Sequence, residues 1–211
     1  MIDIILVRHG QTDWNAAETF RGRVDIALNE TGLKQAEELG TFLGDEKIEI
    51  IYSSPLQRAT TTAGAIARRQ GLEVNTVANL TDFDFGEWQG LPFAEVSQEY
   101  PELYRDWQDT PEQLKVPGGE SLEDVRRRAV PFIEDAVMLC GDGKVVFVSH
   151  HVVIRVVLCA LLGLNLSHFW NLKIDTCGIS RFAAGEGRLV FTKHNDTSFL
   201  SAANLVTQKD S

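Results

Sequence analysis

Cysteine is scarce in this sequence, and the spacing of its cysteines matches no metal-binding motif. The 211 residues contain three, Cys140, Cys159 and Cys177, an odd number with no Cys-x-x-Cys pair. This usage argues against a disulfide framework and against a thiolate zinc site. We therefore expect the three cysteines to be packing residues.

Long apolar runs and an excess of positive charge are also missing. No segment reaches the roughly 20 apolar residues of a membrane span, and residues 2–7 are typical of a strand rather than of an export signal. The formal net charge is −10 at pH 7, which repels polyanions. These absences predict a cytoplasmic protein that binds neither nucleic acid nor a membrane, although a few arginines in one pocket can still bind a small phosphate.

The sequence does contain short apolar runs that alternate with amphipathic helical patterns. Strands are expected at 2–7, 48–52, 74–77 and 144–148, with a hairpin formed by 179–183 and 189–192. Helices are expected around 31–43, 55–70, 124–137 and 151–162. On the first of these helices, Leu33, Ala36, Gly40 and Leu43 fall on the face expected to be buried.

This order of elements predicts an α/β fold and one domain over residues 1–211. We expect a three-layer α/β/α sandwich with a mostly parallel sheet and helices on both faces. Residues 91–119 break the alternation, because Tyr100, Tyr104 and Trp107 are interspersed there with prolines. That pattern indicates an irregular helical insertion, and insertions of this kind often cover a ligand site.

Two of the apolar runs lead directly into a histidine. One run is followed by Arg8 and His9, and another by Ser149 and His150. Open α/β sheets bind their ligands just beyond the carboxyl ends of strands. Both histidines therefore lie where chemistry is expected, provided that the two strands are neighbours in one sheet.

The turn that begins at Arg8 and His9 combines several groups that suit phosphate chemistry. It also carries the Thr12 hydroxyl and the Asn15 amide. A neutral imidazole can attack phosphorus, while arginines bind the phosphoryl oxygens through charge-assisted hydrogen bonds. This chemistry requires no metal and no other cofactor. Thr12 also has a second interpretation, as a cap or turn residue whose hydroxyl bonds to the backbone.

Several ordered motifs together resemble the histidine phosphatase superfamily, also called phosphoglycerate-mutase-like, over nearly the whole chain. They are the segments 7–15, 28–36, 53–59, 117–121 and 148–150. The resemblance implies that His9 is the phosphorylated nucleophile. It also implies that Arg8, Arg58 and His150 bind the phosphoryl group, with a further contact from Asn15.

Cleavage of a phosphoester also needs a proton for the leaving alkoxide. By resemblance, many members of the family carry a glutamate for this purpose at the position that Asp82 occupies here. Asp82 is therefore the predicted acid, and packing by Phe83 or Phe85 would have to keep its shorter side chain protonated. Asp84 and Glu87 are the alternatives.

Two positions depart from the family's pattern. His151 stands where members commonly have glycine, and it adds a substrate-binding side chain at the pocket edge. Arg21 stands where a small polar residue or glutamine is usual, and it can bind a second anionic group of the substrate. The alternative for Arg21 is a surface arginine. His168 and His194 are interpreted as non-catalytic.

The resemblance favours a phosphomonoesterase that acts on a small phosphorylated metabolite through a phosphohistidine. The alternatives are a bisphosphoglycerate-dependent phosphoglycerate mutase, an α-ribazole-phosphate phosphatase and, less favoured, a non-catalytic phosphoanion-binding module. The family's mutases are typically longer with a more basic insertion, whereas residues 91–119 contain only Arg105 and Lys115. If Phe169 and Trp170 are exposed, they permit a homodimer interface.

Overall fold

The computed structural model describes residues 1–205, which contain one six-stranded mixed sheet with the order β3-β2-β4-β1-β5-β6. Its strands are β1 (Ile2–Arg8), β2 (Ile50–Ser53), β3 (Val74–Thr76), β4 (Gly143–Ser149), β5 (Ile179–Gly185) and β6 (Arg188–Asp196). Strands β3, β2, β4 and β1 pair in parallel, whereas β5 and β6 are antiparallel to their neighbours. The predicted α/β fold with a mostly parallel sheet is confirmed.

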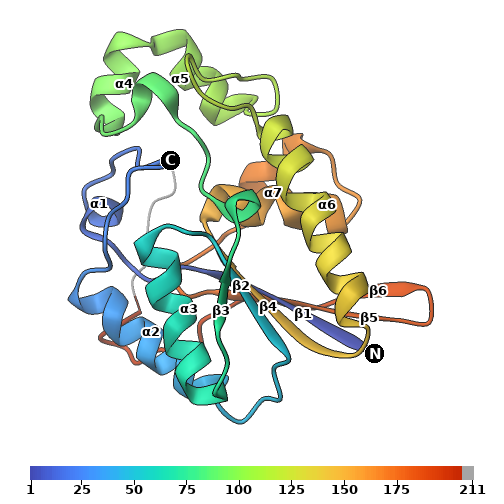
Figure 1. Cartoon of the computed structure of the whole chain (residues 1–211). Coiled ribbons are helices and arrows are strands. Elements are labelled where there is room, and N and C mark those ends of the chain that lie inside the picture. The colour runs from blue at the N-terminus through green and yellow to red at the C-terminus, as the bar shows by residue number, and fades with distance from the viewer. Residues whose placement is uncertain (206–211) are drawn as a thin grey trace.

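Helices cover both faces of this sheet, as predicted (Figure 1). The α-helices in the described part of the chain are α1 (Asp13–Ala16), α2 (Glu30–Phe42), α3 (Gln57–Gln70), α4 (Phe93–Glu99), α5 (Pro101–Asp109), α6 (Leu122–Cys140) and α7 (His151–Leu161). Short 3-10 helices are η1 (Ala78–Leu80), η2 (Gly86–Trp88) and η3 (Leu166–Asn171). None of the helices within residues 1–205 has the length and apolar character to cross a bilayer.

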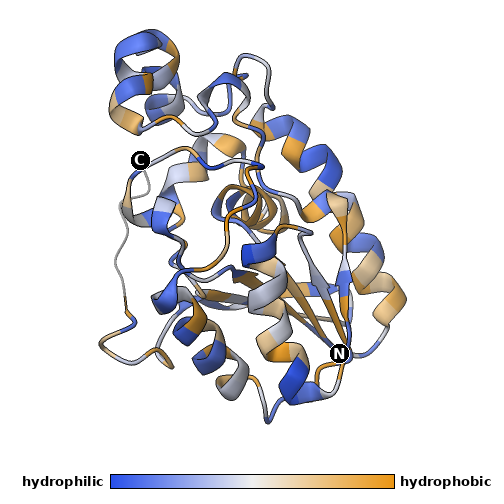
Figure 2. Ribbon diagram, turned by 60° about the vertical axis from the view of Figure 1, so that its left-hand side comes forward, coloured by the Kyte–Doolittle hydropathy of each residue, from blue (hydrophilic) through white to orange (hydrophobic). Residues whose placement is uncertain are grey.

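Alternate side chains of the central strands build two separate cores. Ile4 and Leu6 of β1 pack with residues of α6 and α7, whereas Ile5 and Val7 pack with residues of α2 and α3. Because successive side chains of a strand point to opposite faces, a strand covered on both sides is apolar at every position. Figure 2 shows the resulting concentration of hydrophobic residues on the central strands and on α7.

The predicted buried face of α2 is partly wrong, because Leu33 is 48% exposed. The helix instead buries Gly32, Gln35 and Leu39. Gly32 lies so close to the turn after β1 that a Cβ atom there would be 2.1 Å from the Gln11 carbonyl oxygen. Gln35 accepts a hydrogen bond from the Gln11 backbone N–H at 2.9 Å. This contact holds α2 against the turn that carries His9 and turns Leu33 toward solvent.

The insertion at 91–119 is helical, as predicted, and its helices α4 and α5 pack on the loop that follows β1. Phe20 of that loop contacts Phe93 of α4, with ring centroids 4.5 Å apart, and Trp107 of α5 at 6.5 Å. The insertion therefore closes one side of the region beyond the carboxyl ends of the strands. The prediction of one domain over residues 1–211 stays a prediction, and residues 206–211 lie outside those described.

Of the two aromatic residues that were expected to permit a dimer interface, one lies inside the molecule and the other is partly covered. Phe169 is fully buried and Trp170 is half-buried, so the expected exposure of Phe169 is wrong. Their rings pack at 5.7 Å and 5.2 Å from Trp107 because η3 folds back onto α5. A homodimer stays a prediction and has no support from these two residues.

The cysteines are free thiols in the described chain. Cys159 and Cys177 are buried, as expected of packing residues, and Cys140 is half-buried at the end of α6. Residues 1–205 also contain no group of three or more histidine, cysteine, aspartate or glutamate side chains arranged to hold a metal ion.

Candidate active site

Strands β1 and β4 are neighbours, so the two histidines that follow them lie together. Arg8 is paired with Ser149 at the end of the parallel ladder, and the His9 backbone N–H donates to the Ser149 carbonyl at 3.0 Å. The imidazole rings of His9 and His150 have centroids 5.1 Å apart, and both are fully buried. The sequence-based condition for a joint site is met.

One ring nitrogen of His9 makes a hydrogen bond, and the other makes none in the described part of the chain. Its Nδ1 lies 2.6 Å from the Gly10 carbonyl oxygen, which can only accept, so Nδ1 carries the proton. Its Nε2 is buried and has no hydrogen-bond partner among the described residues. Burial, the Arg58 guanidinium and His150 lower the pKa of His9 well below its usual range. His9 is therefore a neutral imidazole with a free lone pair on Nε2.

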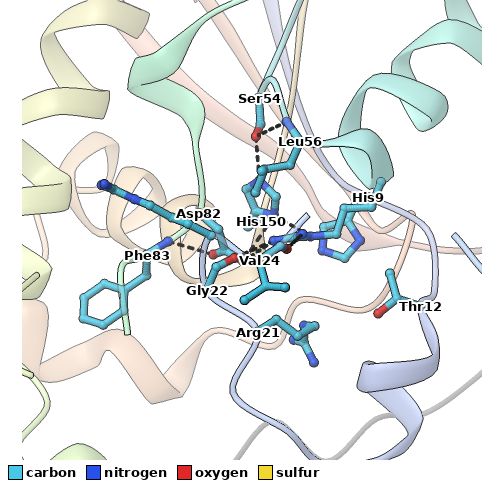
Figure 3. Close-up of polar contacts among 12 residues, drawn as sticks. His9, Thr12, Arg21, Gly22, Val24, Ser54, Leu56, Asp82, Phe83 and His150 are labelled. Atoms are coloured by element: carbon cyan, nitrogen blue, oxygen red, sulfur yellow. Dashed lines mark hydrogen bonds and ion pairs between the residues drawn. The ribbon is translucent and has the colours of Figure 1, made fainter. Parts of the chain in front are cut away.

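His150 is fixed by contacts with both ring nitrogens (Figure 3). Its Nε2 lies 2.8 Å from the Ser54 hydroxyl, and its Nδ1 lies 3.3 Å from both Arg58 Nε and Asp82 Oδ2. Burial and the Arg58 charge lower the pKa of His150 well below its usual range. His150 is thus held in one orientation beside His9.

Arg58 is the central cation of the site and comes from the first turn of α3. It is fully buried, and it donates to the carbonyl oxygens of Gly22 and Val24 at 2.8 Å each. Its Nη2 also donates to Asp82 Oδ2 at 2.9 Å. A buried guanidinium is stable only when such partners surround it. These bonds aim Arg58 at the histidine pair.

The turn after β1 contributes a second buried arginine and a helix cap. Arg8 is fully buried and donates from Nη1 to the Ile174 carbonyl oxygen. Thr12 caps α1: its hydroxyl donates to Asn15 Oδ1 at 2.9 Å and accepts from the Asn15 backbone N–H at 3.3 Å. The cap interpretation of Thr12 therefore fits the structure. Asn15 Nδ2 is buried and has no hydrogen-bond partner in the described chain.

Asp82 is the carboxylate that faces this cluster. It is 1% exposed, and its Oδ1 accepts from the Phe83 backbone N–H at 2.8 Å while its Oδ2 bonds to Arg58. Phe83 and Phe85 are buried beside it, with ring centroids 4.7 Å apart. The carboxyl group thus lies between aromatic packing and the guanidinium.

The two alternative carboxylates are bonded elsewhere. Asp84 accepts from the Gly86 backbone N–H at 3.0 Å and forms an ion pair with Arg23 at 3.3 Å. Glu87 accepts from the Tyr100 hydroxyl at 3.1 Å. Neither side chain lines the pocket described next, so the geometry favours Asp82 as the acid.

A pocket beside the histidines brings the remaining site residues together. Part of this pocket is open to solvent. Its lining consists of Thr19, Phe20, Arg21, Gly22, Asp82, Phe85, Phe93, Trp107 and His151. Arg21 is 8% exposed and donates from Nη1 to the Trp14 carbonyl oxygen at 3.3 Å. The alternative of a surface arginine is therefore wrong, since Arg21 is a buried wall of the pocket.

Two residues of the site were missed by the sequence analysis. Ser54 bonds to His150, and Arg155 of α7 lies 3.1 Å from His151 Nδ1 through its Nη1. A signal for Arg155 was present, because it is the one charged side chain in an otherwise apolar helix. Such a residue is expected to have a specific partner. Nothing in the sequence separates Ser54 from an ordinary residue of a strand-to-helix turn.

The free energy of unfolding of the ligand-free protein should fall as the pH drops below about 6.5, the ordinary pKa of histidine. Burial lowers the pKa of His9, His150 and His151 in the folded protein, so the unfolded chain binds more protons below that value. Below pH 6.5 each of these histidines lowers the free energy of unfolding by about 1.4 kcal/mol per pH unit. Above pH 6.5 they are neutral in both states and cause no such loss.

Urea unfolding between pH 8 and 5.5 tests this dependence. His151→Gln should reduce the slope below about pH 6.5 by roughly 1.4 kcal/mol per pH unit and leave the slope between about pH 7 and 8 unchanged. An identical slope in the variant and the parent protein below pH 6.5 would contradict a neutral, buried His151.

The fold, the paired strand-end histidines and the buried arginines Arg8 and Arg58 beside them define a phosphoryl-transfer enzyme of the α/β class. The chain belongs to the histidine phosphatase superfamily (branch 1), whose model matches residues 4–197. The predicted membership and the predicted phosphatase class are confirmed.

Two relatives and one solved structure similar to this chain carry phosphatase names. The chain is 40% identical over 200 residues to phosphoserine phosphatase 1 of Hydrogenobacter thermophilus, covering 95% of each chain. It is 37% identical over 158 residues to a metal-independent phosphoserine phosphatase of Arabidopsis thaliana, covering 74% of this chain and 66% of the relative. Among solved structures, a phosphoserine phosphatase from Entamoeba histolytica in complex with 3-phosphoglyceric acid matches with a TM-score of 0.86 and 29% identity, covering 95% of this chain and 100% of the other.

Proposed function

We propose that this protein hydrolyses O-phosphoserine, or a closely related small phosphomonoester that carries a carboxylate, through a phosphohistidine at His9. The buried, unpartnered Nε2 of a neutral His9 carries the proposal for the reaction. Support for the substrate comes from the similarity to phosphoserine phosphatase 1 over 95% of both chains.

In the first step, His9 Nε2 attacks the phosphorus atom of the substrate. A P–N bond forms and the P–O bond to the serine side chain breaks, while Asp82 donates its proton to the departing oxygen. Arg8 and Arg58 neutralise the phosphoryl oxygens, and the Asn15 amide adds a hydrogen bond. His150 adds another when its Nε2–H exchanges the Ser54 hydroxyl for a phosphoryl oxygen. The substrate dianion competes with Asp82 for the Arg58 guanidinium, which bonds to Asp82 Oδ2 in the ligand-free protein.

In the second step, water attacks the phosphohistidine. Asp82 is now a carboxylate and takes a proton from that water molecule as the new P–O bond forms. The P–N bond breaks and returns the electron pair to His9 Nε2. Inorganic phosphate then leaves, and Asp82 is again protonated for the next substrate.

A phosphatase is favoured over a mutase by the insertion that covers the pocket. A mutase must retain the dephosphorylated acid and return the phosphoryl group to it. The insertion contributes Phe93 and Trp107 to the pocket wall, and its cationic residues Arg105 and Lys115 are not among the pocket residues. The product therefore meets little positive charge on this side of the pocket.

Phosphate release from O-phospho-L-serine in excess EDTA tests the proposal. We expect multiple turnovers at a rate unchanged by EDTA, since all groups of the proposed mechanism are side chains. Isomerisation of 3-phosphoglycerate should be negligible with or without 2,3-bisphosphoglycerate. A requirement for metal, or primer-dependent isomerisation faster than hydrolysis, would overturn this function.

A further inference from the structure

The pocket beside His9 contains one cationic side chain and one imidazole, and they lie on different elements. We propose that Arg21 and His151 together bind the carboxylate of the substrate, and that Arg155 is the positioning residue that fixes His151 for this task. This inference rests on the proposed function, in which His9 and Arg58 take the phosphoryl group.

Arg21 supplies the charge of this carboxylate site. It lies in the loop between α1 and α2, and its hydrogen bond to the Trp14 carbonyl oxygen orients the guanidinium within the pocket wall. Its charge helps to lower the pKa of His9, His150 and His151, which reflects its proximity to all three rings. A buried guanidinium beside the reacting group can bind a carboxylate through two parallel hydrogen bonds.

His151 supplies a directed donor. An arginine side chain has only donors, so the 3.1 Å contact with Arg155 Nη1 makes His151 Nδ1 the acceptor. The ring proton then lies on Nε2, on the opposite side of a ring that lines the pocket. Burial and the nearby Arg8 and Arg155 charges lower the pKa of His151 well below its usual range. His151 therefore offers one N–H and no full charge.

Arg155 is held too firmly to reach the substrate itself. It is 2% exposed, and its Nε donates to the Leu172 carbonyl oxygen at 2.7 Å. Its guanidinium carbon lies 4.7 Å from the Trp170 ring centroid and 5.2 Å from that of Phe169. These aromatic contacts and the backbone bond fix the guanidinium that sets the His151 tautomer.

Among the described residues, the rest of the pocket contains no carboxylate that is free to pair with an ammonium group. Its other large side chains are aromatic: Phe20, Phe85, Phe93 and Trp107. Asp82 is its one carboxylate, and the proposed reaction already uses it. We therefore expect selection by the carboxylate, so that an analogue with a hydroxyl in place of the amine remains a substrate and an analogue without the carboxylate becomes a poor one.

The test compares kcat/KM for O-phospho-L-serine with that for O-phosphoethanolamine, which lacks the carboxylate. Arg21→Gln should reduce the ratio of the two values by about 10- to 100-fold, the usual effect of losing a charged hydrogen-bonding partner. The control Arg126→Gln removes an exposed arginine that pairs with Glu123 on its own helix, and it should leave the ratio unchanged. An equal loss for both substrates in Arg21→Gln would overturn the inference.

Arg155 is tested in two backgrounds. Arg155→Lys keeps the charge but lacks the planar guanidinium, whose separate N–H groups bond to the Leu172 carbonyl and to His151. We therefore expect KM for phosphoserine to rise about 3- to 30-fold. The glutamine of His151→Gln has an N–H donor whose proton position does not depend on Arg155. If Arg155 acts through the tautomer of His151, Arg155→Lys should therefore have little further effect on KM in the His151→Gln variant. The same loss in both backgrounds would show a purely structural role for Arg155 and would overturn that part of the inference.

Failure of this inference can be told apart from failure of the proposed function. If phosphoserine is not hydrolysed but 3-phosphoglycerate is, with the same dependence on Arg21, the carboxylate site stands and the assigned substrate is wrong. If phosphoserine is hydrolysed with no selective dependence on Arg21, the function stands and the carboxylate site is wrong.

Discussion

Replacing His9 with alanine is expected to lower kcat for phosphoserine by about 10⁴-fold or more, because no other group can form the covalent intermediate. His9 Nε2 is the unpartnered nitrogen at the meeting point of β1 and β4. Arg58 and His150 are bonded through their own partners and cannot take its place. Phosphate release under saturating substrate measures the effect.

Two controls make this result specific to the nucleophile. His168→Ala changes a histidine outside the pocket and should retain the parent rate. Circular dichroism of His9→Ala should match that of the parent protein, since the small side chain leaves the β1 and β4 ladder intact. A His9→Ala rate within about tenfold of the parent rate would remove His9 as the nucleophile, because covalent catalysis contributes far more than that.

Replacing Asp82 with asparagine should slow hydrolysis of phosphoserine by about 10²- to 10⁴-fold, the usual contribution of a general acid. The serine alkoxide leaves poorly without a proton. The p-nitrophenolate ion leaves well as an anion, so p-nitrophenyl phosphate should lose less than about tenfold in the same variant. The ratio of the two losses is the measurement that identifies the acid.

Matched variants separate an acid from a structural carboxylate. Asp84→Asn changes the neighbouring carboxylate, which bonds to Gly86 and Arg23 outside the pocket, and it should not alter the ratio. Asp82→Glu restores a carboxylic acid and should recover much of the phosphoserine activity. If Asp82→Asn slows both substrates equally, its ion pair with Arg58 is structural and the acid lies elsewhere.

The sequence predicted those parts of the fold that depend on local patterns. Ile4 to Val7 are apolar at every position because β1 is covered on both faces, and this run led directly to Arg8 and His9. The neighbouring position of β1 and β4 was only a condition of the sequence-based argument, and the parallel ladder between them meets it. The buried face of α2 was predicted wrongly, since a backbone contact at Gly32 decides how that helix is turned, and residue periodicity does not contain this contact.

The sequence predicted those residues of the candidate site that belong to recognisable motifs. The motifs singled out His9, Arg58 and His150, and the structure brings these side chains together. The bond between His151 and Arg155 spans one turn of α7. Its proposed role in substrate binding, however, also requires Arg21, which reaches the same pocket from a loop distant in the sequence. Such a contact is set by tertiary packing, so the sequence offered only an isolated charge in an apolar helix.

The most direct test of the account is rapid quenching of the enzyme with phosphoserine into alkali, where phosphohistidine is stable, followed by peptide mass spectrometry. The account predicts one phosphoryl group per chain on the peptide that contains His9, formed before steady-state phosphate release and absent in His9→Ala. A burst of serine with no phosphorylated peptide, or with the phosphoryl group on another residue, would contradict it.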